Sequence, residues 1–223
     1  MLANVYLHEV LDVRFEKEVR PRLRGKATLC RYADDFVGVF TEEADARRVM
    51  EVLPKRFGKY GLTLHPDKTG LIPFRPPVDR KGTGSEGNAK GPGRFDLLGF
   101  THFWGRSRRG YWVVKRKTAK GRFGRALGRI AEWCRKTRHK PIPEQHKGLR
   151  QKLQGHYGYY GITGNSQALV RFKFEVERIW RKWLGTRSWH TPRSWAWFMD
   201  LLRRHPLPPP RAVHSVLAHA ANL

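Results

Sequence analysis

The β-prone segments of this chain all lie before residue 115, and the pattern beyond them is helical. Two runs, Ala27–Tyr32 and Phe36–Phe40, flank a short turn and predict a β-hairpin. A second hairpin is expected from Phe95–Trp104 and Tyr111–Val114. From about residue 118 onward, apolar residues recur at helical spacing. This order predicts an α+β fold that continues into an all-α module.

The remaining elements follow from the same periodicities. Helices are expected over 2–18, 42–59, 118–138, 143–161, 165–185, 191–204 and 211–221, and short strands over 62–64 and 69–74. Residues 76–93 contain eight Gly or Pro and have no apolar pattern, which indicates a flexible loop. We therefore divide the chain into a first domain of residues 1–114 and a helical module of residues 115–223.

Charge differs greatly between the two parts of the chain. Residues 1–100 hold 18 basic and 14 acidic side chains, whereas residues 101–223 hold 27 basic and 5 acidic ones. Because the second part folds against its own repulsion, a polyanionic partner is favoured over a solubilising surface. A membrane-surface helix would need a clean apolar face opposite a cationic face. Aromatic and cationic residues alternate here instead, which favours nucleic acid.

Cysteine content and hydropathy bear on the compartment. The chain has two cysteines, Cys30 and Cys134, so a disulfide framework is excluded and a reducing compartment is expected. No 18-residue apolar run occurs, and residues 1–12 lack the charged start of a signal peptide. The sequence has no cluster of His and Cys residues, so no structural metal is expected. The sequence therefore predicts a cytoplasmic protein without a membrane span, and it leaves the oligomeric state open.

Asp34 and Asp35 lie together in the first predicted turn. Asp is a common turn residue, so the pair has a purely structural explanation. A tight turn between apolar strands would also fix the height of a carboxylate, and Mg²⁺ prefers such oxygen ligands. Two-metal nucleotidyl transfer uses carboxylates shared between ions about 3.5–4 Å apart. That site needs a further carboxylate, and Asp67, Asp79 and Asp96 are poor candidates because they lie in or beside turns and loops.

Tyr32-Ala33-Asp34-Asp35 is one of several motifs in a recognisable order. The others are Leu2–His8, Leu62–Thr69, Phe95–Phe100, Leu153–Gly161 with Trp180–Trp183, and Arg211–Ser215. Together they resemble the group II intron reverse transcriptase/maturase family over nearly the whole chain, from its catalytic box to its thumb and C-terminal tail. In that family the fingers, the first metal-binding palm aspartate and a Pro-Gln-Gly turn would lie upstream of Leu2. The chain is therefore expected to be the C-terminal part of a polymerase.

The resemblance implies a partial polymerase palm in residues 1–114 and a thumb/maturase module in residues 115–223. It implies RNA-directed DNA polymerase activity with Mg²⁺, or Mn²⁺, as the cofactor. Asp34 would be the catalytic residue that ligates both metal ions, and Asp35 its catalytic neighbour, ligating less directly. Tyr32 and Ala33 would lie against the primer end and the incoming nucleotide.

The resemblance also implies roles for two further segments. Lys68 would face phosphate, and a solvated turn lysine is the alternative. Leu98, Gly99 and Phe100 would form the strand that supports the primer terminus, since glycine lets a backbone approach closely. An ordinary core hairpin is the alternative there.

RNA-binding candidates gather at the start of the helical module and on its second helix. A cationic band is formed by Lys115, Arg116, Lys117, Lys120, Arg122, Arg125 and Arg129. Such a band binds phosphates without reading sequence. The aromatic candidates, interleaved with small glycines, offer stacking faces to RNA: His156, Tyr157, Tyr159 and Tyr160. Tyr157 and Tyr160 also suit a helical core, and the core is the expected place of Trp180, Trp183, Trp195 and Trp197.

The expected function is the C-terminal portion of a bacterial-type group II intron reverse transcriptase/maturase, a mobile-element protein that also assists RNA splicing. The resemblance implies intron RNA, template RNA, a DNA primer and deoxynucleoside triphosphates as partners. This chain alone is expected to lack a complete active site, because the first palm aspartate would lie upstream. The alternatives are a non-catalytic, RNA-binding splicing cofactor of the maturase type and a truncated remnant.

Overall fold

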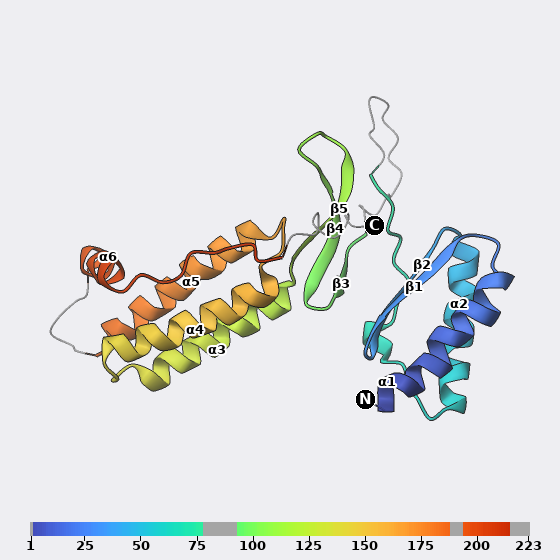
Figure 1. Cartoon of the computed structure of the whole chain (residues 1–223), viewed down its shortest axis with the longest axis horizontal. Coiled ribbons are helices and arrows are strands. Elements are labelled where there is room, and N and C mark those ends of the chain that lie inside the picture. Colours follow the sequence, from blue (N-terminus) through green and yellow to red (C-terminus); the bar gives the residue numbers. More distant parts are fainter. Residues whose placement is uncertain (1, 78–92, 188–193, 215–223) are drawn as a thin grey trace. The chain divides into compact units, whose positions relative to one another are not determined.

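The computed structural model describes residues 2–77, 93–187 and 194–214. The described residues contain helices and two small antiparallel sheets, which confirms the predicted α+β class (Figure 1). The chain forms two compact units, Met1–Leu98 and Gly99–Leu223. The boundary between them therefore lies earlier in the chain than residue 114, where the sequence placed the domain division. No helix among the described residues is long and apolar enough to cross a membrane.

The first unit begins with the helical segment expected over residues 2–18. It runs through α1 (Leu2–Leu7), the π-helical segments His8–Val13 and Phe15–Val19, and the 3₁₀ turn Arg20–Arg22. One face of this segment carries the buried residues Val10, Leu11 and Phe15. The expected helix is thus present, but wider π turns replace α turns over most of its length.

The predicted hairpin is formed by β1 (Ala27–Tyr32) and β2 (Asp35–Phe40), which pair antiparallel. Successive side chains alternate between two faces, so Leu29 and Phe36 pack against the core residues Val10, Leu11 and Phe57. The helix α2 (Glu43–Lys59) supplies Phe57 and contacts β2. Its buried Asp45 accepts hydrogen bonds from the backbone N–H groups of Arg24 and Gly25 at 2.8 and 2.9 Å. Asp45 thereby ties the approach of β1 to the start of α2.

The prediction of strands over residues 62–64 and 69–74 is wrong. These segments have no regular secondary structure, and a 3₁₀ turn (Pro66–Lys68) separates them. Leu62 and Leu64 pack on the core of the unit, which explains their alternating pattern. A β-prone run becomes a strand only where another strand pairs with it. The flexible loop expected over 76–93 lies largely in residues 78–92, outside the described residues.

The second sheet has the order β3-β4-β5, with β3 (Phe95–Leu97), β4 (Phe100–Arg106) and β5 (Trp112–Thr118). The hairpin of β4 and β5 confirms the second predicted hairpin. Leu98 and Gly99, expected within a strand, instead form a two-residue turn with φ of 50° and 79°. Such a turn needs positive φ at its centre, a conformation that a strand does not have. The strand predicted over residues 95–104 is therefore divided into β3 and β4.

Four helices complete the second unit, as the apolar periodicity predicts. They are α3 (Lys120–Thr137), α4 (Ile142–Tyr160), α5 (Ser166–Gly185) and α6 (Trp195–Arg204). Figure 1 shows α3, α4 and α5 lying alongside one another. Their core includes Leu149, Leu153, Phe172 and Trp180, each less than 2% exposed.

The tryptophans follow the expectation in part. Trp180 is fully buried, Trp183 and Trp197 pack against the core, and Trp195 is 45% exposed. The last helix expected, over 211–221, is not formed in residues 211–214, and its remainder lies outside the described residues. The tail before it runs back to α4, where the carbonyl oxygen of Pro208 accepts a hydrogen bond from the Tyr157 hydroxyl.

Candidate functional site

The aspartate pair lies at a two-residue turn, as predicted. Ala33 and Asp34 form the turn, and Tyr32 and Asp35 face each other as the last pair of the ladder. Ala33 has a φ of 55°. Glycine is favoured at such positions, and a residue with a Cβ costs about 1 kcal/mol there. Surrounding contacts must therefore hold this turn in place.

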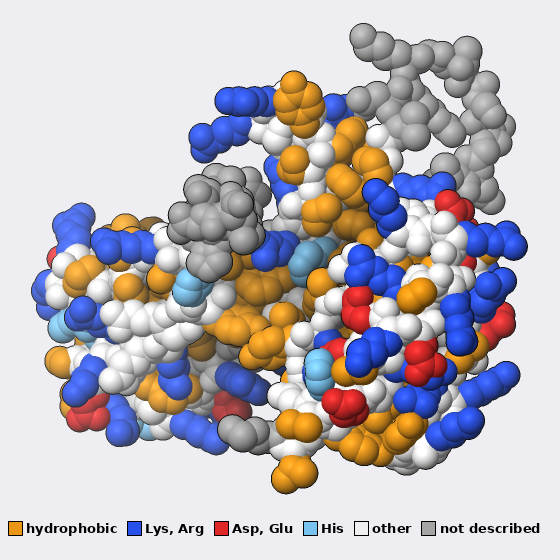
Figure 2. Space-filling model, turned by 45° about the vertical axis from the view of Figure 1, so that its right-hand side comes forward, with side chains coloured by type: hydrophobic (Ala, Val, Ile, Leu, Met, Phe, Trp, Pro, Cys, Tyr) orange, Lys and Arg blue, Asp and Glu red, His pale blue; other side chains and the backbone are white. Residues whose placement is uncertain are grey.

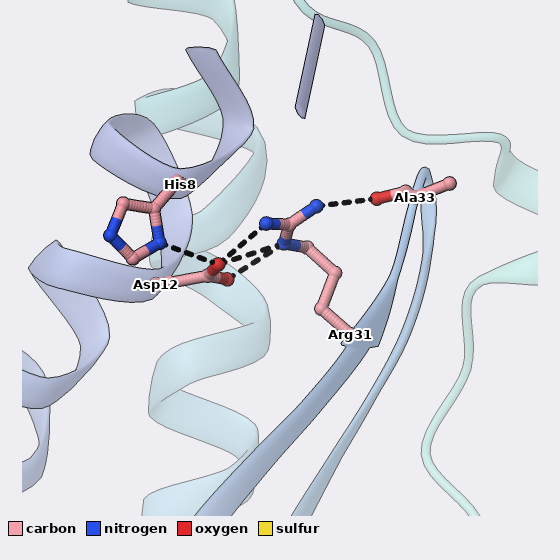
Figure 3. Close-up of polar contacts among 4 residues, drawn as sticks. All are labelled: His8, Asp12, Arg31 and Ala33. Carbon is pink, nitrogen blue, oxygen red and sulfur yellow. Dashed lines mark hydrogen bonds and ion pairs between the residues drawn. The ribbon is translucent and has the colours of Figure 1, made fainter. Parts of the chain in front are cut away.

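Arg31 makes the contacts that hold the turn (Figure 3). Its Nη1 donates a hydrogen bond to the carbonyl oxygen of Ala33 at 2.8 Å. Its Nε and Nη2 donate to the carboxylate of Asp12, at 2.8 Å and 2.6 Å respectively. The same carboxylate lies 3.1 Å from Nδ1 of His8. The turn is thereby fixed to the helical segment at the start of the unit.

The Asp12–Arg31 pair stays charged near neutral pH. Hydrogen bonding to Arg31 lowers the pKa of Asp12, although burial works against this shift, and His8 lowers it further. The same bonds to Asp12 raise the pKa of Arg31. With 13% and 25% of their side chains exposed, Arg31 and Asp12 form a partly buried, bidentate ion pair. Its planar geometry fixes the direction of the remaining Arg31 donor toward Ala33.

Asp34 and Asp35 are exposed, and within the described residues neither carboxylate has a hydrogen-bond or ion-pair partner. Their oxygens are hard ligands of the kind that Mg²⁺ prefers. No group of three His, Cys, Asp or Glu in the described part of the chain could hold a metal ion. The turn thus supplies two carboxylate groups of the right chemistry, and the other ligands of a divalent cation would have to come from water, phosphate or a further segment.

Of the other residues predicted for the primer and nucleotide, Tyr32 lies beside this turn, and Lys68 and Phe100 come from other elements. Tyr32 is 68% exposed and shares its sheet face with Asp35. Lys68 is exposed in the 3₁₀ turn that follows α2. Phe100 begins β4, and its ring stacks on Tyr159 with centroids 5.9 Å apart.

The cationic band is divided between two elements of the second unit. On β5, Lys115 and Lys117 share one face with Phe103, and Arg116 lies on the other face. Lys117 Nζ lies 5.0 Å from the Phe103 ring centroid, and the Arg106 guanidinium 4.3 Å from that of Trp112. Figure 2 shows blue basic and orange apolar side chains together on this hairpin.

The helical part of the band borders a pocket of about 330 Å³. Arg122, Arg125 and Arg129 are three and four residues apart, so they project from one face of α3. Lys152 and His156 of α4 complete its polar lining. Tyr160 and Phe172 add aromatic walls, so that three helices contribute to the pocket.

His156 is packed as an aromatic residue. Its ring stacks on Phe172 with centroids 3.6 Å apart and an interplanar angle of 7°. Burial lowers the pKa of His156 to about 4, so the ring is neutral near pH 7. Its Nε2 is shielded from solvent and has no hydrogen-bond partner within the described residues.

Two tyrosines of α4 have different roles from one another. Tyr157 is only 4% exposed and lies in the helical core, so its ring is closed to RNA and the prediction for it is wrong. Tyr159 is 54% exposed and keeps a ring face available to solvent. One turn of α4 thus presents one tyrosine inward and the other outward.

The sequence analysis did not identify the residues that support the aspartate turn and the pocket. Arg31 directly precedes the aspartate box, which is a usable signal, whereas Asp12 carries none. Lys152, four residues before His156, was detectable by helical spacing alone. A comparison with protein-family models found no match, and a comparison with curated proteins found none either.

Proposed function

We propose that this chain is part of a reverse transcriptase of the group II intron maturase type, with the β1–β2 turn as its catalytic turn. The observation that carries the proposal is the pair of carboxylates beside a turn residue with positive φ, neither of which has a hydrogen-bond or ion-pair partner within the described residues. Strained backbone that its surroundings over-determine is concentrated at functional sites. Two-residue hairpin turns take positive φ as a rule, so the conformation of Ala33 suits a structural turn as well, whereas two adjacent exposed carboxylates at one turn suit a divalent cation.

The residues of the turn divide the work of nucleotidyl transfer. Mg²⁺, when bound, would neutralise charge on the attacking and leaving oxygens of the reacting phosphate. Asp34 and Asp35 would supply two of its anionic oxygen ligands. Arg31, through the Ala33 carbonyl, would keep both carboxylates at a fixed position. Tyr32, on the same face as Asp35, would offer its exposed ring to the primer end.

The second unit would hold the RNA. All five of its acidic residues already pair with a cation three or four residues away: Glu132, Glu144, Glu175, Glu177 and Asp200. Among the described residues of the unit, far more basic side chains have no carboxylate partner than have one, which favours binding to the phosphates of intron and template RNA. A non-catalytic splicing cofactor is the second candidate, because this unit could bind RNA without the aspartate turn.

DNA synthesis on an RNA template separates the two candidates. The polypeptide encoded by the complete reading frame is assayed with a DNA primer, deoxynucleoside triphosphates and Mg²⁺. Asp34→Asn should reduce synthesis by about 100-fold or more, because an anionic metal ligand is lost. Asn is equally suited to a turn, so folding and RNA affinity should not change.

Asp67→Asn is the matched control, since Asp67 is an exposed carboxylate in the 3₁₀ turn after α2. It should leave DNA synthesis unchanged. Equal activity of the Asp34→Asn variant and the wild type would contradict the polymerase proposal and favour the splicing cofactor. A joint loss of synthesis and RNA affinity would make Asp34 a structural turn residue.

A further inference from the structure

The pocket between α3, α4 and α5 concentrates positive charge that nothing in the described protein neutralises. Arg122, Arg125, Arg129 and Lys152 border it, and none of them has an ion-pair partner within the described residues. The five carboxylates of the unit are each engaged elsewhere. Four like charges around one concavity raise the free energy of the protein. A bound anion would remove that cost.

The same pocket has a wall suited to a planar ring. His156 and Tyr160 lie with ring centroids 4.6 Å apart, and the Phe172 ring stacks on that of His156 with centroids 3.6 Å apart. Burial raises the pKa of the Tyr160 hydroxyl, although the charges of Arg122 and Arg125 oppose this shift. The hydroxyl is therefore protonated near pH 7 and available as a donor beside the cations.

The size of the pocket limits what can enter. A volume of about 330 Å³ lies at the lower end of the range for small-molecule sites, roughly 300–1,000 Å³. A folded RNA helix is far too large, whereas a single nucleotide is of suitable size. A lone inorganic anion would leave the aromatic wall without a contact.

We propose that this pocket binds one nucleotide unit, with its phosphate among Arg122, Arg125, Arg129 and Lys152 and its base against His156 and Tyr160. Guanidinium groups suit phosphate because they donate paired hydrogen bonds. Unstacked bases are commonly held on aromatic rings. The inference rests on the RNA-binding part of the proposed function and is independent of DNA synthesis. The unit is either a nucleotide splayed out of a strand or a free mononucleotide.

Calorimetric titration of the full chain tests the proposal with three separate probes: AMP, adenosine and inorganic phosphate. AMP should bind saturably, and adenosine and phosphate should each bind at least about tenfold more weakly, because each makes only half of the contacts. Equal binding of AMP and adenosine would overturn the phosphate assignment. Equal binding of AMP and phosphate would overturn the base assignment.

A pair of charge-matched variants distinguishes the pocket from general electrostatics. Arg125→Gln combined with Arg129→Gln should weaken AMP binding about tenfold or more. Lys147→Gln combined with Arg150→Gln removes the same charge from exposed positions of α4 outside the pocket, and AMP binding should be unchanged. Equal weakening by both pairs would overturn the proposal. Circular dichroism confirms that each variant is folded.

A trinucleotide of adenylate without terminal phosphates identifies the source of the unit. If it competes with AMP and binds more tightly, the pocket takes a nucleotide from a strand. If AMP binds and the trinucleotide does not compete, the ligand is a free mononucleotide. Absence of saturable AMP binding would overturn the pocket inference. RNA binding by the second unit and DNA synthesis at the turn are measured by separate experiments, so this result would not decide the proposed function.

Discussion

Arg31 attaches the aspartate turn to the rest of its unit. One guanidinium binds both Asp12 and the carbonyl oxygen of Ala33, so the backbone of the turn depends on a carboxylate 19 residues away from Arg31. Removal of either charged partner would leave the other partly buried and unpaired, which costs more than the pair itself contributes. The geometry of the candidate metal ligands is therefore set from outside the four-residue motif.

His156 makes the stability of the second unit depend on pH. In an unfolded chain a histidine titrates near pH 6.5, whereas burial lowers the pKa of His156 to about 4. Between these values the unfolded chain binds a proton that the folded chain does not. Folding stability is therefore full above pH 6.5 and falls as the pH decreases toward 4.

His156→Phe should remove this dependence, because Phe keeps the stack on Phe172 and does not titrate. Between about pH 7.5 and about pH 4.5 the variant should lose about 2 kcal/mol less unfolding free energy than the wild type, allowing for partial solvent access. Urea unfolding followed by tryptophan fluorescence measures it, since all eight tryptophans lie in the second unit. His139→Phe, at an exposed position, is the control; matching pH profiles for the two variants would contradict the prediction.

At the residue scale, local signals were predictable and distant partners were not. The turn at Asp34 follows from two β-prone runs with aspartates between them. The pairing of Asp12 with Arg31 joins two elements, and no spacing in the sequence marks it. Tyr157 and Tyr159 have the same chemistry, so only the orientation of α4 decides that one is core and the other exposed.

Asn165 joins the end of β5 to the connection between α4 and α5. Its Oδ1 accepts a hydrogen bond from the Thr118 backbone N–H at 3.0 Å. Its Nδ2 donates to Thr118 Oγ1 and to the carbonyl oxygen of Tyr160, both at 2.9 Å. Because Asn165 is 1% exposed, these bonds have no water to replace them. One side chain thus orients the hairpin of β4 and β5 on the helices of its unit.

Asn165→Ala should reduce the unfolding free energy by about 2–3 kcal/mol, since it leaves buried backbone and hydroxyl groups unsatisfied. The measurement is urea unfolding followed by tryptophan fluorescence at neutral pH. Gln167→Ala, at an exposed position of α5, should change stability by no more than about 0.5 kcal/mol. If both variants unfold at the same urea concentration as the wild type, the Asn165 network contributes nothing to stability.

At the element scale, the sequence predicted helices better than strands. An amphipathic helix is specified within one segment, and α3, α4 and α5 each lie within two residues of their predicted bounds. A strand also needs a partner, which residues 62–64 and 69–74 do not find. The turn at Leu98 and Gly99 depends on positive φ at a leucine, a conformation that the residue type argues against.

Net charge is a property of the whole chain, and its division between the units has a measurable consequence. The formal net charge is +26, and residues 101–223 hold 27 basic against 5 acidic side chains. Residues 1–100 are nearly balanced. Electrostatic attraction to RNA should therefore come almost entirely from the second unit, whichever enzyme or cofactor it belongs to.

RNA affinity should consequently depend steeply on salt and reside in Gly99–Leu223. Each neutralised phosphate releases counterions, so log affinity against log salt should fall with a slope of about −0.7 per phosphate on single strands. Filter binding of a labelled RNA over a salt series measures the slope for the full chain and for each unit expressed separately. Met1–Leu98 alone should have almost no affinity for RNA. Gly99–Leu223 alone should show the same slope of log affinity against log salt as the full chain. A flat salt response, or full affinity in Met1–Leu98, would show that the charge asymmetry does not drive RNA binding.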